Sequence, residues 1–462
     1  MKSYEKNMTQ GPSGRQIFFF ALPLMAGNIF QQAYTLVDTA VVGQVVGVNA
    51  LAALGSADWF NWMSLGVCSG LTQGFSILAA QQFGAKKSSD LKHTLSVSLV
   101  LSLVCSVLIT GLFLLLSHPV LRLMGTRPEI LEDALIYIRI MFSGIPIVML
   151  YNWLSSVLRA IGDGKTPLIA MGIASVCNIV LDILFVAGFG WGIPGAAAAT
   201  LIAQGISCVY CILYISKTPV LKFSRKDFTP DPALIKNLFA LGSPVAVQNV
   251  IISIGGMILQ SIVNTFGVVF VAGFTATNKL YGLLEIAAIS FGFSVSTYTG
   301  QNLGAGKYER IRKGVREGAG MAVLTSLVIT VCMLLFGNFL VSLFVDKSSP
   351  DAEQVILYAR HFLNVLSSFL FVLYCLHIYR SALQGMGNTV IPLLSGFAEL
   401  VMRISAALIL PRFIGEYGIY SAEVAAWIGS VLLLFFFYQK NLKCLLKNQR
   451  KKEPSETSGL PL

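Results

Sequence analysis

Asp38 and Asp182 are carboxylates that interrupt long apolar stretches in the first half of this 462-residue chain. Asp38 follows Tyr34 by one helical turn, so the two side chains share a face. Asp182 follows Asn178 by one turn, and Thr200 lies in the next apolar stretch. Their carboxylate, amide and hydroxyl oxygens could hold a proton or Na⁺ away from water. We therefore expect a cation site, the alternative being two hydrogen-bonded structural aspartates on separate faces.

The second half also carries charged residues within apolar stretches. Glu399 and Arg403 are spaced i,i+4, which most simply forms an ion pair within one helix. Lys279 and Glu285 point to different faces of their helix. Lys279 and Glu285 could each line a cavity and select substrates by charge, or be a satisfied buried ion, and Glu399 and Arg403 are further candidates for that cavity. The stretch that opens this half has no carboxylate to match Asp38, so we expect the chemistry of the two halves to differ.

Motifs of enzymatic catalysis are missing from the sequence. Residues 164–166 resemble the end of a phosphate-binding loop, but Arg159 stands where that loop needs a glycine. There is no His-Glu-x-x-His motif and no nucleophile elbow, and the 4 histidines are dispersed. Cys208 and Cys211 have a CxxC spacing inside an apolar stretch, where packing is the simpler interpretation. The sequence predicts no enzyme and no cofactor, so an ion gradient supplies the energy unless transport is passive.

Composition predicts the elements that must position these residues. The chain is 55% hydrophobic and 12% charged, and its mean hydropathy is +0.73. Average soluble domains are about 25% charged, and a helix needs roughly 20 apolar residues to cross a membrane. We expect an all-α polytopic membrane protein with twelve transmembrane helices, at about 15–46, 50–83, 92–117, 130–160, 167–188, 192–216, 234–264, 270–302, 314–344, 354–386, 391–411 and 418–441.

Basic residues are distributed unevenly between the two sides of this topology. With the N-terminus inside, 25 of the 33 Lys and Arg residues fall in internal segments. By the positive-inside rule, this asymmetry predicts that both termini are cytoplasmic. We expect a multi-pass protein of the cell (plasma or inner) membrane. The net charge of +11 is then mostly topological and requires no nucleic acid as a partner.

Three short motifs recur in the same order in the two halves of the chain. They are QQFGAKK (81–87) with QNLGAGK (301–307), LRAIGD (158–163) with LQGMGN (383–388), and WGI (191–193) with YGI (417–419). We expect two six-helix lobes, 1–216 and 234–447, joined by a cytoplasmic linker at 217–233 and followed by a disordered tail at 448–462. Because six is even, a pseudo-twofold axis along the membrane normal relates the lobes, with a pathway between them that permits alternating access.

Helix rise places the candidate cation site in the outer half of the N-terminal lobe. At 1.5 Å per residue, Asp182 lies roughly 22 Å from the inner end of its helix, and Thr200 about 12 Å from the outer end of its own. Asp38 is near the outer end of the first helix. Pro23 in that helix removes a backbone hydrogen bond and can bend it.

With these features the sequence resembles the MATE family (multidrug and toxic compound extrusion). The likeness rests on twelve spans in two parallel halves, on the QxxGA ends of spans 2 and 8, and on the Arg-Ala-Ile-Gly-Asp turn at 159–163. It covers about residues 15–445. Members of the family export organic cations and other amphipathic compounds in exchange for H⁺ or Na⁺.

The resemblance is closest to the DinF-like branch of that family. This branch carries an aspartate in helix 1, an Asn-x-x-x-Asp pair in helix 5, a threonine in helix 6 and polar helpers in helices 1 and 4. The NorM-like branch instead relies on acidic residues in helices 7 and 10, which are missing here. The resemblance implies a bend near Pro23 when the site changes its ion, and a cation-coupling set of Asp38, Asn178, Asp182 and Thr200 with Tyr34 and Asn152 as helpers.

We therefore expect a secondary antiporter that exports small organic cations by alternating access. The coupling ion is H⁺ or Na⁺, with no other cofactor or metal, and the protein works as a monomer among membrane lipids. The first alternative is a passive or lipid-directed flippase on the same scaffold, acting on lipids or lipid-linked precursors. The second is an integral membrane enzyme or a receptor-like binding protein.

Overall fold

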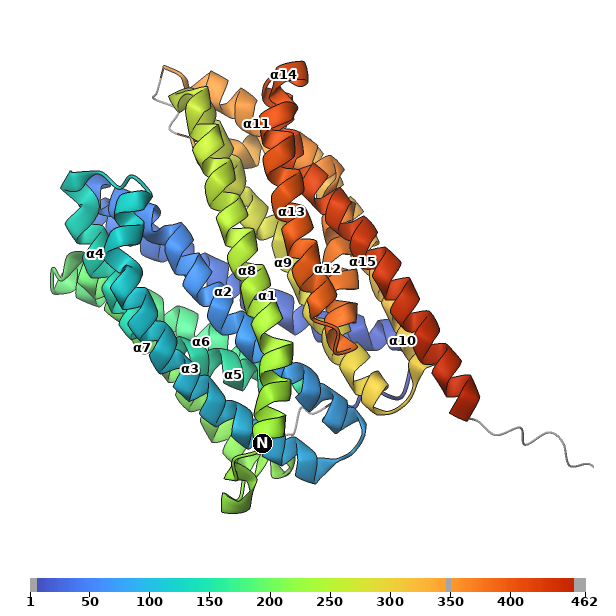
Figure 1. Cartoon of the computed structure of the whole chain (residues 1–462). Helices are drawn as coiled ribbons and strands as arrows, with labels where there is room; N and C mark the ends of the chain where they lie inside the picture. Colours follow the sequence, from blue (N-terminus) through green and yellow to red (C-terminus); the bar gives the residue numbers. More distant parts are fainter. Residues whose placement is uncertain (1–5, 346–349, 453–462) are drawn as a thin grey trace, which may run out of the picture.

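The chain folds into a bundle of long helices, and the computed structural model describes residues 6–345 and 350–452 (Figure 1). Within these residues nine helices are long and apolar enough to cross a membrane, and two bent helix pairs bring the number to 11. A further helix, α1 (Ser13–Val45), has the length of a span but a lower hydropathy, because polar side chains such as Gln31 and Gln32 lie along it. The predicted all-α membrane architecture is confirmed, and a helix or bent pair lies in each predicted stretch.

The other helices of the first half are α2 (Val48–Gly84), α3 (Ser88–Leu123), α4 (Pro128–Ser143), α5 (Ile145–Ala160), α6 (Lys165–Asp182) and α7 (Gly192–Lys217). The second half repeats this series as α8 (Pro232–Val263), α9 (Val268–Gly304), α10 (Tyr308–Ser342), α11 (Ala352–Ser368), α12 (Leu370–Gly385), α13 (Val390–Ile409), the short α14 (Pro411–Ile414) and α15 (Glu416–Lys452).

Both halves bend their fourth span at a corresponding place. Helices α4 and α5 meet at 47° beside Gly144, and α11 and α12 meet at 49° beside Phe369. In the first half Pro146 explains the break, because a proline in the first turn of α5 has no N–H to bond back into α4. The matched bends agree with the internal repeat.

Helices α2 and α9 touch at the end of the bundle where the chain begins, which we call the N-terminal end. A Cβ on Gly84 of α2 would lie 1.9 Å from the carbonyl oxygen of Gln301, and a Cβ on Gly304 of α9 would lie 1.8 Å from that of Gln81. These four residues are the glutamines and glycines of the repeated QxxGA motif. The motif is therefore explained by reciprocal backbone contact between the halves, an approach that only glycine permits.

The first helix of each half packs partly on the other half. Helix α1 contacts α9 and α10 as well as α6, and α8 contacts α2 as well as α13. Asn28 and Asn249 follow Pro23 and Pro244 of their helices at the same spacing. Asn28 donates a hydrogen bond to α9 at 3.2 Å, and Asn249 donates one to α2 at 2.8 Å. Each crossing is thus secured by an equivalent polar side chain.

Residues 6–12 join both halves at the N-terminal end. The N–H of Met8 donates to Oε1 of Gln301 at 2.8 Å, and the Met8 carbonyl accepts from Arg310 at 3.2 Å. The N–H of Lys6 donates to the carbonyl of Ile161, in the first half, at 3.2 Å. Met8 itself is fully buried. This segment therefore adds contacts that keep the N-terminal end closed.

Two 3₁₀ turns connect α7 to α8 across the predicted linker. The carboxylate of Asp231 caps α8 by accepting from the N–H groups of Leu234 and Ala233, and these bonds lower its pKa. At the other terminus α15 continues to Lys452, past the point where the sequence places the start of a disordered tail. The rest of that predicted tail, 453–462, lies outside the described residues.

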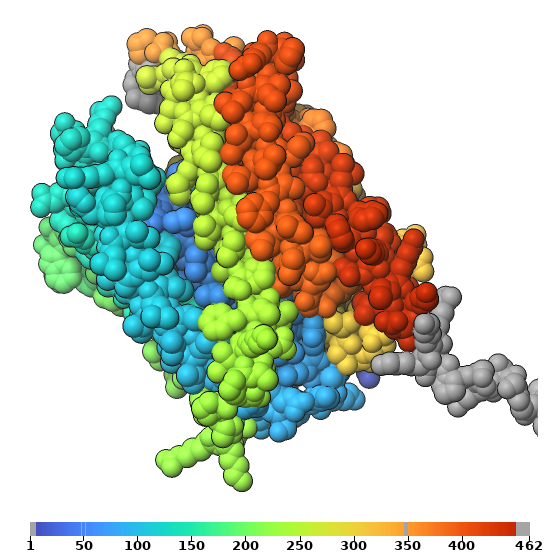
Figure 2. Space-filling view, in the orientation of Figure 1, coloured from blue at the N-terminus to red at the C-terminus, as the bar shows by residue number. Residues whose placement is uncertain are grey.

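At the end opposite the N-terminal end, the two halves separate. Figure 2 shows the molecule hollowed between α3 and α4 on one side and α8 on the other, with blue helices of the first half behind. We call this hollow the cleft. Because the halves touch at the N-terminal end, the cleft opens away from it.

Replacing Gly84 or Gly304 with alanine should destabilise the protein by about 1–3 kcal/mol, because the added methyl group forces two backbones apart. Thermal unfolding of the purified protein in detergent measures the effect. Gly111→Ala is the matched control, since a Cβ there meets nothing within 4 Å. Wild-type unfolding temperatures for both the Gly84 and Gly304 variants would contradict the close contact.

Candidate functional site

Helices α1 and α6 bury the two predicted carboxylates of the first half. Asp182 is fully buried at the last residue of α6, and Asp38 is 9% exposed on α1. A π-helical turn, Ile183–Gly188, follows Asp182 directly. Such turns are uncommon and recur at functional sites, because they redirect side chains at the end of a helix. The carboxylates interact electrostatically with each other, so the structure brings them together.

Three of the predicted partner residues lie around these carboxylates. Asn178 is buried one turn before Asp182, and its Nδ2 donates to the hydroxyl of Thr200 on α7 at 3.3 Å. Tyr34 is buried on α1 and interacts electrostatically with both aspartates. The structure thus gathers five of the six predicted residues from α1, α6 and α7. The sixth, Asn152, instead donates to the carbonyl of Val148 in its own helix at 2.9 Å.

The cluster is rich in oxygen atoms that accept no hydrogen bond. Both carboxylate oxygens of Asp182, Oδ1 of Asp38, Oδ1 of Asn178 and Oε1 of Gln204 are buried, and no described group donates to them. A buried acceptor without a donor destabilises a fold by about 1–3 kcal/mol. Because these five atoms are all oxygens, the cluster presents acceptors that a proton donor or a cation can bind. We call Asp38, Asp182, Asn178, Thr200, Tyr34 and Gln204 the acidic cluster.

A third carboxylate belongs to the same region and was missed in the sequence. Asp58 is half-buried on α2 and interacts electrostatically with Asp38. The signal that identified Asp38, an ionisable residue inside an apolar stretch, applies equally to Asp58. Gln204, which faces Tyr34 from α7, carried no comparable signal, because uncharged amides are common in these helices.

The second half holds its charges in ion pairs between helices. Arg380 of α12 pairs with Glu399 of α13, which also accepts from the hydroxyl of Ser430 at 3.0 Å. Arg403 of α13 pairs with Glu423 of α15 at 2.9 Å. The predicted pair within one helix, Glu399 with Arg403, is therefore wrong as a hydrogen-bonded contact. Each residue reaches a neighbouring helix instead, because both face the core of this half.

Arg403 occupies the position that corresponds to Asn178 in the first half. Pro167 and Pro392 lie at matching places in α6 and α13. Asn178 and Arg403 follow these prolines by the same number of residues. The guanidinium of Arg403 supplies a fixed positive charge there, neutralised by Glu423. Counted in the same way, Asp182 corresponds to Ala407, and Asp38 corresponds to Leu259. The second half thus has no carboxylate at these two positions, as the sequence led us to expect.

The two remaining predicted residues of the second half behave differently from each other. Glu285 lies 3.3 Å from Nε2 of His377 on α12, so it has a partner in its own half. Lys279 is exposed, and among the described residues it forms no ion pair within 4.0 Å. Its electrostatic interaction is with Asp58 of the first half.

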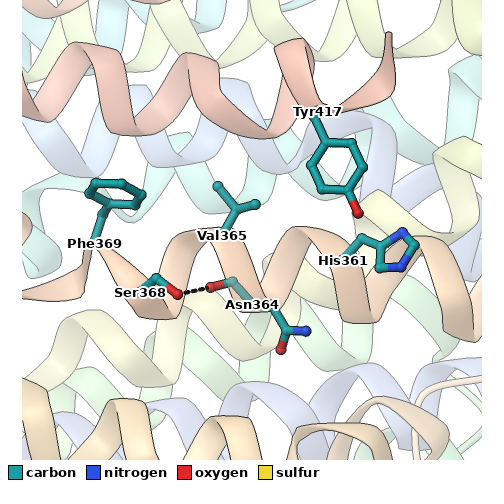
Figure 3. A pocket seen from close by; sticks show the side chains of 6 residues that line it. All are labelled: His361, Asn364, Val365, Ser368, Phe369 and Tyr417. Carbon is teal, nitrogen blue, oxygen red and sulfur yellow. Dashed lines mark hydrogen bonds between the residues drawn. The ribbon is translucent and has the colours of Figure 1, made fainter. Parts of the chain in front are cut away.

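A separate small pocket lies between α11 and α15 (Figure 3). Figure 3 shows the ring of His361 beside that of Tyr417, at 5.5 Å between centroids, while Ser368 donates to the carbonyl of Asn364 at 2.7 Å. None of the residues that line this pocket is acidic. It therefore offers no carboxylate for a coupling cation.

Comparison with a family model gives independent evidence for the internal repeat. The model described as MatE matches the chain twice, at residues 23–184 and 244–409. The two matches begin near the equivalent prolines Pro23 and Pro244. The duplication seen in the short motifs therefore extends through the first five spans of each half.

Named relatives cover nearly the whole chain. "Probable multidrug resistance protein YpnP" of Bacillus subtilis is 31% identical over 446 residues, which are 95% of this chain and 97% of the relative. "Multidrug export protein MepA" of Staphylococcus haemolyticus is 24% identical, covering 92% and 93% of the two chains. A solved structure described as the outward-facing conformation of a multidrug resistance MATE family transporter is 25% identical with a TM-score of 0.90, covering 96% of this chain and 99% of that one.

Removing one partner of the Arg403–Glu423 pair should destabilise the protein by about 3–5 kcal/mol, because the other charge stays buried without a partner. Changing both residues to leucine should recover much of the loss. Lys87→Ala is the control, because Lys87 and Asp90 form an exposed pair at 3.6 Å that contributes less than about 1 kcal/mol. Denaturant unfolding in detergent compares the variants; equal stability of Arg403→Leu and wild type would argue against the pair.

Proposed function

The chain belongs to the MatE family of multidrug efflux transporters, and from that premise we propose that it is a secondary antiporter. It exports amphipathic organic cations in exchange for H⁺ or Na⁺ by alternating access. The acidic cluster is the site where the coupling ion binds. The cleft between the two halves is the path of the substrate.

The observation that carries this proposal is the absence, within the described part of the chain, of cationic partners for the carboxylates of the acidic cluster and for the neighbouring Asp58. Asp38, Asp58 and Asp182 form no ion pair within 4.0 Å among the described residues, whereas Glu399 and Glu423 in the second half are paired with arginines. An isolated carboxylate in a low-dielectric interior is unfavourable unless a proton or cation neutralises it. Carboxylate oxygens suit either H⁺ or Na⁺, and the amide oxygens beside them suit Na⁺.

The exchange follows from competition for the same negative charge. With the cleft open away from the N-terminal end, H⁺ or Na⁺ binds at Asp38 and Asp182 and weakens their attraction for a cationic substrate, which leaves. When the halves rock and the cleft opens at the N-terminal end, the ion leaves. The restored negative charge then attracts the next substrate. Each ligand thus shifts the state that it binds more tightly.

Pro23 is suited to a part in this rocking. It lies in α1, which contacts α9 and α10 of the second half as well as α6 of the first. A proline removes one backbone hydrogen bond, so α1 can bend at this point at lower energetic cost than elsewhere. We assign Pro23 as the point where α1 bends when the coupling ion is exchanged.

The N-terminal end of the bundle is assigned to the cytoplasm. Both termini lie on that side, since 25 of the 33 Lys and Arg residues then fall in internal segments. The protein acts in the plasma or inner membrane as a monomer of two lobes, 1–216 and 234–447. We place it in the DinF-like branch, because its acidic cluster lies in the first lobe while Arg403 occupies the corresponding position in the second.

Asp38→Asn and Asp182→Asn should each abolish gradient-driven efflux, because the amide takes up no proton at neutral pH and removes the negative charge that attracts Na⁺. The measurement is efflux of a fluorescent organic cation from proteoliposomes, with a pH gradient and a Na⁺ gradient imposed separately. The gradient that drives wild-type efflux identifies the ion.

Asp90→Asn is the control for this experiment, because Asp90 is an exposed residue at the start of α3 and should leave efflux unchanged. Full efflux by both cluster variants would overturn the assignment of the acidic cluster. Wild-type transport that ignores both gradients would instead indicate a passive or lipid-directed flippase.

A further inference from the structure

Lys279 is an exposed ammonium group on a helix whose other face is buried. Phe274, Leu280 and Leu284 of α9 belong to the core of the second half. Lys279 lies on a different face, one turn before Gly282, where a Cβ would lie 3.6 Å from the side-chain amide of Gln32 on α1. The face of α9 that carries Lys279 is therefore turned toward α1.

The internal repeat gives the same direction for Lys279 independently. Helices α2 and α9 begin after the equivalent glycines Gly47 and Gly267, and counting equally from each leads to Trp59 and Lys279. The Trp59 ring packs on Gly256 of α8, with ring carbons within 2.3–3.2 Å of the place of a Cβ. Since α1 is the counterpart of α8, Lys279 is directed toward α1, where Gln31, Gln32 and Thr35 form a polar strip.

Asp58 of α2 is the carboxylate of the first half that interacts electrostatically with Lys279, and α2 packs against α9. The two charges interact electrostatically, yet they form no ion pair within 4.0 Å. Each charge is therefore left with hydrogen-bonding capacity toward a ligand between the halves. Trp62, one turn after Asp58 on the same side of α2, is 61% exposed and offers an aromatic surface beside it.

We propose that Lys279 and Asp58 are the two poles of a binding site for amphipathic molecules that carry both an organic cation and a carboxylate. The carboxylate of the ligand binds the Lys279 ammonium, its cationic group lies against Asp58, and its apolar body packs on Trp62. A ligand that carries only the cationic group offers no acceptor to the Lys279 ammonium, and the ammonium repels the positive charge of that ligand. Lys279 is thus a specificity residue of the proposed export reaction, on which this inference rests.

Rhodamine B and rhodamine B ethyl ester are a matched pair of probes, because the first has a cationic ring system and a free carboxylate and the second has the same cation without the carboxylate. Fluorescence polarisation with purified protein in detergent at neutral pH gives both Kd values. We expect wild type to bind rhodamine B about tenfold more tightly than the ester. Lys279→Met should remove this preference by weakening the binding of rhodamine B, and Lys279→Arg should retain the preference.

Lys313→Met is the control, because Lys313 forms a surface pair with Glu317 on α10 and should leave the preference unchanged. Asp58→Asn should weaken the binding of both probes, since both carry the cationic ring system. A wild-type protein without the preference, or a Lys279→Met variant that keeps it while eluting as a folded monodisperse protein, would overturn the proposal. Because binding is measured without a gradient, failure of ion-coupled export and failure of this site give different results.

Discussion

Buried carboxyl groups without a cationic partner among the described residues, in the first half of the chain, are the constraint on which the rest of this structure depends. Asp38 and Asp182 are buried with oxygens that accept no hydrogen bond from any described residue, and Asp58 adds a third carboxylate nearby. Burying an ionised carboxylate in a low-dielectric interior is unfavourable unless a counter-charge is present. A proton or a cation at the acidic cluster would supply that counter-charge. The proposed coupling of the protein's state to an external ion rests on this property of the cluster.

The two halves share backbone geometry and differ in charge. Gly84 and Gly304 repeat the same close contact, and Asn28 and Asn249 repeat the same crossing bond, because both halves must fit each other at the N-terminal end. Charged side chains face no such requirement. Arg403 has a counter-charge within its own half and needs no external ion, whereas its counterpart Asn178 leaves the acidic cluster without one. Among the described residues, the duplicated scaffold thus pairs its buried carboxylates with arginines in the second half and leaves Asp38 and Asp182 unpaired in the first.

Much of the architecture could be predicted from the sequence, because a membrane imposes strong periodicity and length on each helix. Asp38 and Asp182 could be identified for the same reason, since charge is rare in such helices. Pairing between helices could not be predicted. The i,i+4 spacing of Glu399 and Arg403 is satisfied by many geometries, and only tertiary packing directs these side chains to Arg380 and Glu423. The closure by residues 6–12 is likewise invisible in a polar segment whose partners lie almost 300 residues away.

Equilibrium binding of a fluorescent organic cation at varied pH and varied Na⁺ concentration tests the central claim most directly. If the coupling ion and the charged group of the substrate compete for the acidic cluster, raising the concentration of one of the two ions, H⁺ or Na⁺, will weaken substrate binding to wild type. The ion that has this effect is the coupling ion. In the double variant Asp38→Asn, Asp182→Asn, the substrate Kd will not change with the concentration of either ion. Substrate affinity in wild type that is independent of both ions would contradict the account.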